Sequence, residues 1–310
     1  MELEDVLEEY RYHCLAKGFT EKTMRNKRQE LNQMKTYLME KRAITDLESV
    51  TVHDMRAFIR RKQIAGLQPQ SIVAMIKLIS AFFNWCISEE YLVENPMTKV
   101  EKPKVPKKIM KGFTPQDIHK MIDSFTYKSY LEARNKAIIA MLADCGLRSM
   151  EIRGLRSINV NDTTIMINGK GNKERIVFIS PVLKKILIRY ERLRKQFCRE
   201  KMIINSDRYF LTYLGEGLSH VALYNVVKEA GERAGIVGKR VSPHTFRHFY
   251  AVQALSTGQM DVYSLSRILG HSDIATTQRY LTSLSDIQLQ DKAVSSSPLM
   301  NLFKGDPSNE

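Results

Sequence analysis

The N-terminal third of the chain places its apolar residues at the three- and four-residue spacing of amphipathic helices. A polar helix is expected from about residue 20 to residue 40, with Leu31, Met34 and Leu38 on its apolar face. Thr51 and Asp54 have the spacing of a capping box that begins another helix. Residues 71–87 carry a broader apolar stripe that includes Trp85, and helical spacing favours a core over a cofactor site. The pattern predicts a four-helix domain over residues 1–98.

The remaining two thirds of the chain alternate between helical and strand-like patterns. Thr114-Pro115-Gln116-Asp117 is a strong helix start, and a buried helix over residues 133–143 should stop at Gly146. Residues 157–180 are rich in β-branched side chains and contain two turn signals, which predicts about three short antiparallel strands. Helical patterns return from Pro181 to about Lys201 and again from Val221. The expected fold is mainly α with a small antiparallel β-sheet. The second domain is expected over residues 113–287.

Two segments concentrate positive charge. Residues 99–111 read KVEKPKVPKKIMK, and the two prolines oppose helix, so residues 99–112 are expected to form an extended basic linker. Contact with phosphates is predicted for four of its lysines: Lys102, Lys104, Lys107 and Lys108. The helix near residues 184–201 carries eight Lys or Arg against two Glu. The charged face of that helix is either a solvated surface or a binding surface, and the sequence favours neither interpretation.

Composition narrows the class of protein. The chain has 48 Lys or Arg and 34 Asp or Glu among 310 residues, a net charge of +14 that indicates a polyanionic partner such as nucleic acid. We expect no bilayer-spanning apolar run and no signal peptide, because the first residues are acidic. The four cysteines are far apart and none forms a Cys-x-x-Cys pair. This favours a reducing cytoplasm over disulfides or a zinc cluster.

Several enzyme motifs are absent from the sequence. There is no P-loop, no dinucleotide fingerprint, no Gly-x-Ser-x-Gly elbow, no His-Glu-x-x-His and no convincing carboxylate cluster for a two-metal nuclease. We therefore predict no metal and no cofactor. A nucleic-acid enzyme built from this chain would use protein cations in place of a metal ion.

The sequence offers such cations at several turns. Arg148 lies just past Gly146, and Glu151 three residues later shares its helix face and could orient the guanidinium. Ser242 and Pro243 begin a helix on which His244 and Arg247 point toward one spot. His271 follows a glycine at a turn, and Tyr280 comes nine residues after it. Each residue alone has an ordinary structural explanation, but their order together is unusual.

The segments GLRSMEI, GKGNKER, HTFRH and LGHSDIATTQRY, in this order, resemble the tyrosine recombinases of the phage-integrase type, particularly their short Xer-like members. The resemblance covers nearly all of residues 1–285 and implies a helical core-binding domain followed by a catalytic domain. Matched residue by residue, it implies a catalytic set with Glu151 as the acidic companion of the first arginine: Arg148, Lys170, His244, Arg247, His271 and Tyr280. Lys173 lies in the same turn as Lys170, so the identity of the general acid stays open.

The resemblance implies site-specific cutting and rejoining of double-stranded DNA through a 3′-phosphotyrosyl link, by four protomers on two paired sites. The role would be integration, excision or resolution, in the cytoplasm. Two rivals remain: a type IB topoisomerase that relaxes supercoils, and a DNA-binding regulator with a decayed site. Residues 288–310 carry Leu299, Met300, Leu302 and Phe303. They are expected either to dock on a neighbouring protomer or to form a disordered tail.

Overall fold

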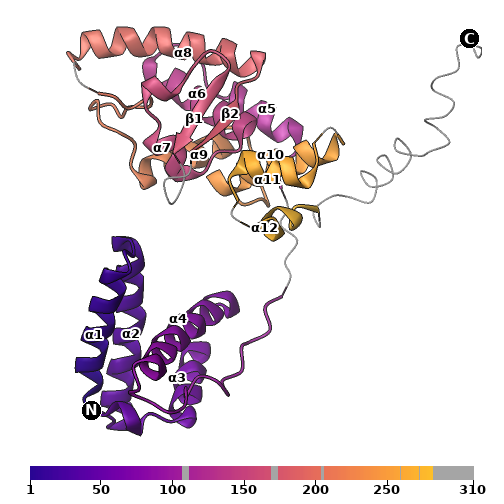
Figure 1. Ribbon diagram of the computed structural model, residues 1–310. Coiled ribbons are helices and arrows are strands. Elements are labelled where there is room, and N and C mark those ends of the chain that lie inside the picture. Colours follow the sequence, from indigo (N-terminus) through magenta and orange to yellow (C-terminus); the bar gives the residue numbers. More distant parts are fainter. Residues whose placement is uncertain (107–111, 169–173, 204–205, 259, 272, 282–310) are drawn as a thin grey trace, which may run out of the picture. The chain divides into compact units, whose positions relative to one another are not determined.

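The structure is a computed structural model of the chain, and it describes residues 1–106, 112–168, 174–203, 206–258, 260–271 and 273–281. The chain divides into two compact units, Met1–Lys108 and Ile109–Glu310 (Figure 1). Each unit has a hydrophobic core of its own, and each is therefore described by itself.

The described part of the first unit consists of α-helices and one short 3-10 turn. They are α1 (Leu3–Ala16), α2 (Glu21–Arg42), η1 (Leu47–Ser49), α3 (Val52–Ile64) and α4 (Pro69–Ser88). The hydroxyl of Thr20 accepts a hydrogen bond from the backbone N–H of Thr23, and Thr51 and Asp54 form the predicted capping box. These caps pair N–H groups that a helix leaves free in its first turn. The helices expected between residues 1 and 98 are thus present.

Helix α4 forms the core of the first unit, as its apolar stripe predicts. Its length and apolar composition alone would also allow it to cross a membrane. Its apolar side chains lie in the core of the first unit: Ile72, Met75, Ile76, Ile79, Phe82, Phe83, Trp85 and Cys86. A helix at the centre of a bundle is apolar for much the same reason as a spanning helix, because little of its surface meets water. Burial in the core therefore explains its composition.

The second unit is larger and mixes helices with one small sheet. Its described elements are α5 (Pro115–Asp123), α6 (Tyr130–Cys145), α7 (Ser149–Gly154), η2 (Ser157–Asn159), β1 (Thr164–Asn168), β2 (Glu174–Phe178), α8 (Pro181–Glu200), α9 (His220–Arg233), α10 (Pro243–Ser256), α11 (Val262–Leu269) and α12 (Ala275–Gln278). The mainly helical fold class is confirmed. Thr114 and Asp117 form a capping box at the start of α5, as the sequence predicts.

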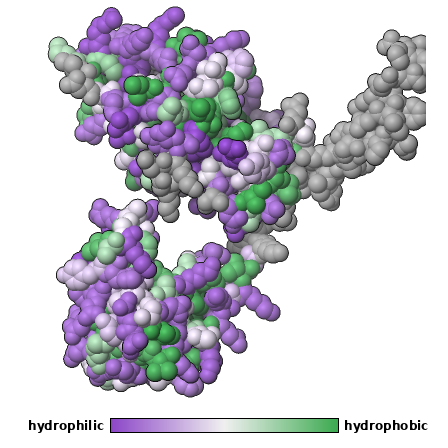
Figure 2. Space-filling view, in the orientation of Figure 1, coloured by the Kyte–Doolittle hydropathy of each residue, from purple (hydrophilic) through white to green (hydrophobic). Residues whose placement is uncertain are grey.

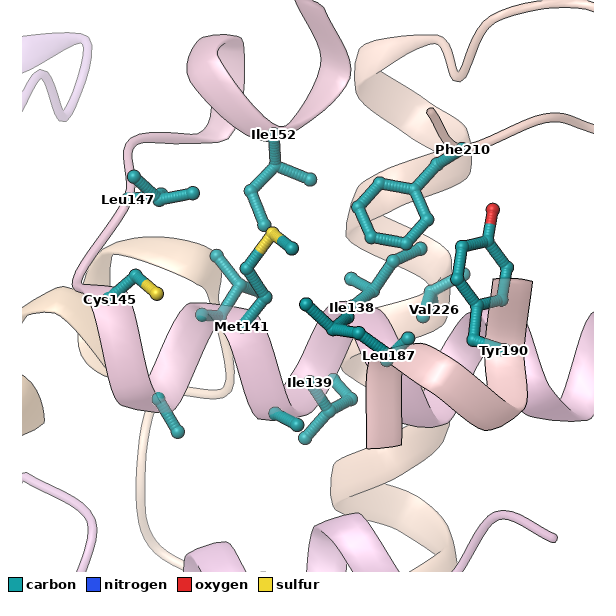
Figure 3. Close-up of a cluster of buried hydrophobic side chains, with 14 of the residues drawn as sticks. Ile138, Ile139, Met141, Cys145, Leu147, Ile152, Leu187, Tyr190, Phe210 and Val226 are labelled. Carbon is teal, nitrogen blue, oxygen red and sulfur yellow. The ribbon is translucent and has the colours of Figure 1, made fainter. Parts of the chain in front are cut away.

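Helix α6 is the central support of the second unit. It packs against α5, α8, α9 and α10, and most of its side chains are buried. Figure 3 shows Ile138 and Ile139 of α6 close to Leu187 of α8. The helix ends at Gly146, which has a left-handed backbone (φ 59°), and a Cβ there would lie 2.5 Å from Cδ1 of Tyr250. Glycine is therefore required where the chain turns toward Arg148.

The sheet is smaller than predicted, because the described residues contain two antiparallel strands and not three. β1 pairs with β2 in a register that places Met166 opposite Ile176. The first β-branched segment forms η2 and a single bridge between Val160 and Ile165. The backbone N–H of Ser157 donates to the carbonyl oxygen of Asp207 (2.8 Å). Because its backbone pairs with this distant residue, the segment does not form the expected third strand.

The basic linker is described only in part. Residues 101–106 form neither helix nor strand, and Lys102 and Lys104 are exposed. Lys107 and Lys108 lie outside the described residues, as does the segment 288–310. The DNA contacts expected of this linker and the docking expected of the C-terminal segment stay predictions.

Candidate active site

Arg148 is held at the start of α7 by Glu151. The Glu151 carboxylate accepts hydrogen bonds from the backbone N–H of Arg148 (2.7 Å) and from Nη1 of its guanidinium (2.9 Å). Nη2 donates to the carbonyl oxygen of Gly270 (2.7 Å). The guanidinium is thus anchored at two points, while its side chain remains 39% exposed and accessible to an anion.

Arg175 on β2 is a second partner of Glu151, and the sequence analysis gave it no role. Its Nη1 and Nη2 donate to the two carboxylate oxygens of Glu151 (2.7 and 2.8 Å), and its Nε donates to the carbonyl oxygen of Ile268 (2.7 Å). A Cβ on Gly270 would lie 2.9 Å from Cδ of Arg175. Strand alternation could have revealed this residue. It shares a face with buried Val177, where an apolar side chain is expected.

Glu151 stays ionised between these two arginines. Its side chain is only 5% exposed, and burial by itself would raise the pKa of the carboxyl group. The hydrogen bonds and charge of Arg175, together with the hydrogen bonds from Arg148, outweigh burial and lower the pKa to about 2. The carboxylate therefore joins both guanidinium groups at neutral pH.

Arg247 of α10 is buried at the centre of the site. Its Nη1 donates to the carbonyl oxygen of Gly146 (2.9 Å), and its Nη2 donates to the carbonyl oxygen of Leu269 (2.6 Å) and to Nε2 of His271 (2.9 Å). Burial, and then the positive charge of Arg148, lower the pKa of Arg247 to about 10. The guanidinium is therefore still cationic at pH 7.

The first turn of α10 presents His244. Ser242 occupies the predicted N-cap position, but its hydroxyl caps no backbone N–H. It lies 3.0 Å from Oγ1 of Thr245, which donates to the carbonyl oxygen of Arg240 (2.6 Å). His244 is exposed, one turn before Arg247. Partial desolvation, and then the charges of Arg247 and Arg240, lower the pKa of His244, so its imidazole is neutral at pH 7.

His271 follows Gly270, whose left-handed backbone (φ 65°) ends α11. Because a guanidinium can only donate, Nε2 of His271 accepts from Arg247, and Nδ1 carries the proton and donates to Oγ1 of Thr277 (2.7 Å). Burial, and then the charges of Arg247 and Arg148, lower the pKa of His271 to about 4. The imidazole is thus neutral and held in one tautomer.

Tyr280 is buried within the second unit. It is 7% exposed and belongs to an apolar cluster with Leu265 and Leu269. Its ring centroid lies 6.2 Å from that of His271, with the rings nearly parallel, and 5.5 Å from that of His248. His248 is buried and had no predicted role, although it stands at the end of the HTFRH segment.

The structure therefore gathers most of the predicted set in one place. Hydrogen bonds, ring contacts and electrostatic interactions link these five residues: Arg148, Glu151, Arg247, His271 and Tyr280. Lys170 and Lys173 lie outside the described residues, so the structure does not choose between them. Across residues 1–281 with the gaps given above, no group of three His, Cys, Asp or Glu could hold a metal ion, and the four cysteines are unpaired.

Acid should weaken the fold through His271. Its pKa is about 4 in the folded chain and about 6.5 in an unfolded one. Between these values the unfolded chain binds more protons, so the free energy of unfolding rises with pH. The contribution of His271 is complete above pH 6.5 and is lost as the pH falls through about 4. His271→Asn should flatten this slope in urea denaturation relative to the wild-type protein. Equal slopes in the variant and the wild type would contradict the assignment.

Comparison with known proteins identifies the class. Residues 111–286 match the Phage integrase family, and residues 7–90 match the N-terminal SAM-like domain of phage integrases. The first match alone covers more than half of the chain. The chain belongs to the Phage integrase family and is a tyrosine recombinase, an enzyme of site-specific DNA recombination.

Individual relatives agree with this assignment. "Tyrosine recombinase XerD" of Listeria innocua is 28% identical over 293 residues, which cover 93% of this chain and 97% of the relative. The Tn1549 transposon integrase, solved with transposon right end DNA, has a TM-score of 0.72 at 14% identity and covers 96% of this chain and 100% of its own. A lambda integrase tetramer, solved on a Holliday junction, has a TM-score of 0.68 at 15% identity and covers 90% of this chain and 77% of its own. These structures share the fold of an N-terminal helical domain and a tyrosine-recombinase catalytic domain.

Proposed function

We propose that the chain cuts and rejoins DNA by transferring a strand onto Tyr280. The phenolic oxygen attacks a backbone phosphorus, the bond from phosphorus to the 5′-oxygen breaks, and a 3′-phosphotyrosyl link and a 5′-hydroxyl result. A 5′-hydroxyl from another strand then attacks the link and releases Tyr280. Because the link keeps one phosphoester bond for each one broken, no ATP is required. Protein cations are proposed to stabilise the charge that a metal ion would otherwise stabilise.

The observation that carries this proposal is the contact of a buried arginine with a neutral histidine beside an enclosed tyrosine: Arg247, His271 and Tyr280. A guanidinium has five N–H donors. Arg247 uses three of them and Arg148 uses two in the hydrogen bonds described above. The remaining donors are available for the nonbridging oxygens of a phosphate, whose negative charge grows in the transition state.

Two proton transfers complete the chemistry. A free tyrosine has a pKa near 10, so only roughly one in a thousand is ionised at pH 7. His244 is neutral at that pH, and we assign to it the acceptance of the phenolic proton. His271 is less suited to this step, because its one acceptor nitrogen, Nε2, already accepts a hydrogen bond from Arg247. We assign protonation of the leaving 5′-oxygen to Lys170, with Lys173 as its alternative. A positioned general acid contributes about 10²–10⁴-fold to the rate.

The proposed assembly on DNA is based on the family resemblance. We propose that four protomers hold two recombination sites on double-stranded DNA in the cytoplasm, with the basic linker on the phosphates and residues 288–310 on a neighbouring protomer. The role is integration, excision or resolution.

The test is covalent trapping in EDTA. A nicked suicide DNA, carrying a site selected by its binding to the protein, loses the cleaved fragment and so traps the intermediate. We expect a covalent protein–DNA band, and peptide mapping should place a phosphotyrosine at residue 280. Tight binding to the same DNA without any band would contradict strand transfer and would indicate a DNA-binding regulator.

Arg175 should act as a positioning residue for Arg148. With Arg175→Gln, Glu151 loses two of the four donors that hold it. Misplacement of a catalytic group by about 1 Å can cost about 10²-fold in rate. We therefore expect single-turnover cleavage at saturating DNA to fall about 10²-fold, with partial rescue by Arg175→Lys. Arg156→Gln, which removes an exposed ion pair with Asp207, is the control. Wild-type cleavage by Arg175→Gln would refute the role.

A further inference from the structure

Helix α8 carries a stripe of positive charge that the active site does not use. Five basic side chains are exposed along it: Lys185, Arg189, Arg192, Lys195 and Arg199. Their separations of three and four residues place them on one face of the helix. Residues 185 to 199 span about 21 Å along the helix axis. We call these five residues the α8 stripe.

The α8 stripe is not neutralised by neighbouring acids. Among the described residues, none of its five members forms an ion pair. Lys184, near the start of α8 and outside the stripe, does form one, with Asp162. Glu191 accepts a hydrogen bond from the hydroxyl of Tyr209 (2.6 Å), and Glu200 accepts one from Nε2 of Gln196 (2.8 Å). Both acids of the helix are therefore engaged by neutral groups, and neither forms an ion pair with the stripe. Five cations against these two acids leave the helix with an excess of positive charge.

The helix beneath the stripe is firmly held. Tyr190 is fully buried and donates to the carbonyl oxygen of Tyr209, and Arg194 donates to the carbonyl oxygens of Tyr209 and Arg208. Arg189 stacks on the ring of Tyr127, with 3.8 Å from the guanidinium carbon to the ring centroid. The charges are thus presented by a fixed scaffold and not by a loose segment.

The α8 stripe lies away from the candidate active site. α6 packs against both α8 and α10, and Figure 1 shows α8 along the upper edge of the second unit, with α10, α11 and α12 on its lower side. Figure 2 shows mostly hydrophilic residues along that upper edge. A duplex whose phosphate reaches Tyr280 therefore meets a different side of this unit from the one that the stripe occupies.

The chemistry of the stripe fits duplex DNA better than a protein. Protein interfaces rely on buried aromatic and apolar anchors, whereas the large apolar side chains that α8 exposes are Val182 at its start and Ile188 among the cations. Backbone binding of DNA needs only cations at phosphate positions. A length of about 21 Å matches about six phosphates of one strand, which lie about 3.4 Å apart along the duplex axis.

We propose that the α8 stripe is a second DNA-binding surface, which holds the phosphate backbone of a duplex other than the one in the active site. The binding is independent of sequence and of cleavage. This second site rests on the proposed function only in assuming that the active site binds DNA. The second site and the strand-transfer activity can be tested separately.

The test compares two charge-matched variants. The stripe variant is Lys185→Gln, Arg192→Gln and Arg199→Gln, which keeps the Arg189 stack on Tyr127. The control variant removes three exposed charges elsewhere in the same unit: Lys120→Gln, Lys128→Gln and Arg156→Gln. Each protein is saturated with a short labelled duplex carrying its site. A second, nonspecific duplex with another label is then titrated in at several salt concentrations.

We expect the complex of the wild-type protein to bind the second duplex. In the stripe variant the slope of log affinity against log salt should become shallower by about 3, because each lost phosphate contact removes about 0.9 from the slope. The control variant should keep the wild-type slope. Covalent trapping on the first duplex should be the same in all three proteins, so loss of trapping in every protein would count against the proposed function alone.

Two outcomes would overturn the proposal. Equal slopes for the stripe and control variants would show that only overall charge matters and that α8 is a solvated face. Binding of polyglutamate by the wild-type complex and not by the stripe variant, without binding of the second duplex, would assign the stripe to an acidic protein.

Discussion

A protein with Tyr280→Phe is expected to form no covalent complex with suicide DNA, while it still binds that DNA. The substitution removes only the attacking oxygen. The ring should keep its contacts with His248, His271 and the apolar cluster around Leu265 and Leu269. We therefore expect the free energy of unfolding to change by less than about 1 kcal/mol. The covalent band on a denaturing gel, in EDTA, should fall from the wild-type level to background.

A second tyrosine supplies the matched control. Tyr263 lies on α11 in the same unit and is 62% exposed, so Tyr263→Phe removes a hydroxyl without touching the site. It should trap DNA at the wild-type level. A band that persists in Tyr280→Phe would show that another side chain attacks the phosphate. The roles given to Arg148 and Arg247 would then have to be assigned anew around that nucleophile.

The features that the sequence predicted are those decided by residues close together in the chain. Thr51 forms a capping box with Asp54, three positions later, and Thr114 forms another with Asp117. The left-handed end of α6 at Gly146 likewise needs only one residue without a side chain. Such short-range chemistry leaves the same pattern in the sequence wherever the segment lies in the fold.

The features that the sequence did not predict depend on distant partners. Residues 157–160 have the β-branched composition of a strand, but Ser157 pairs with Asp207, fifty residues later. Arg175 is drawn inward by Glu151 and by the carbonyl oxygen of Ile268, which lies 93 positions away. No local pattern specifies such partners.

In the candidate site, too, the sequence predicted the residues but not the contacts between them. Order and spacing along the chain, with the family resemblance, named the residues that the structure brings together around Arg247. The connections between them came only from the structure. Glu151 joins two arginines where the sequence suggested one, and His271 is held in a single tautomer by Arg247 and Thr277. These links decide charge and proton position, which residue identity alone does not give.

Arg247→Gln should cause the second large loss of activity. The change removes a positive charge from the site and leaves the carbonyl oxygens of Gly146 and Leu269 and Nε2 of His271 without their donor. Loss of one donor to a transition-state oxygen costs about 10²–10³-fold, so single-turnover cleavage should fall at least that far. The unpaired buried acceptors should lower the free energy of unfolding by about 1–3 kcal/mol. Arg247→Lys should cleave poorly as well, because one ammonium group cannot reach three acceptors in the geometry of a guanidinium.

The pKa of His271 separates an electrostatic role of Arg247 from a purely structural one. The charge of Arg247 is the second cause, after burial, of the lowered pKa of about 4. Without that charge, the imidazole pKa should rise toward its ordinary value of about 6.5. NMR titration of His271 in the folded Arg247→Gln protein and in the wild-type protein measures this directly. A pKa that stayed near 4 would mean that burial and the remaining positive charges, such as that of Arg148, keep His271 neutral without Arg247. Arg247 would then influence the reaction only through the phosphate, and not through the histidine that it touches.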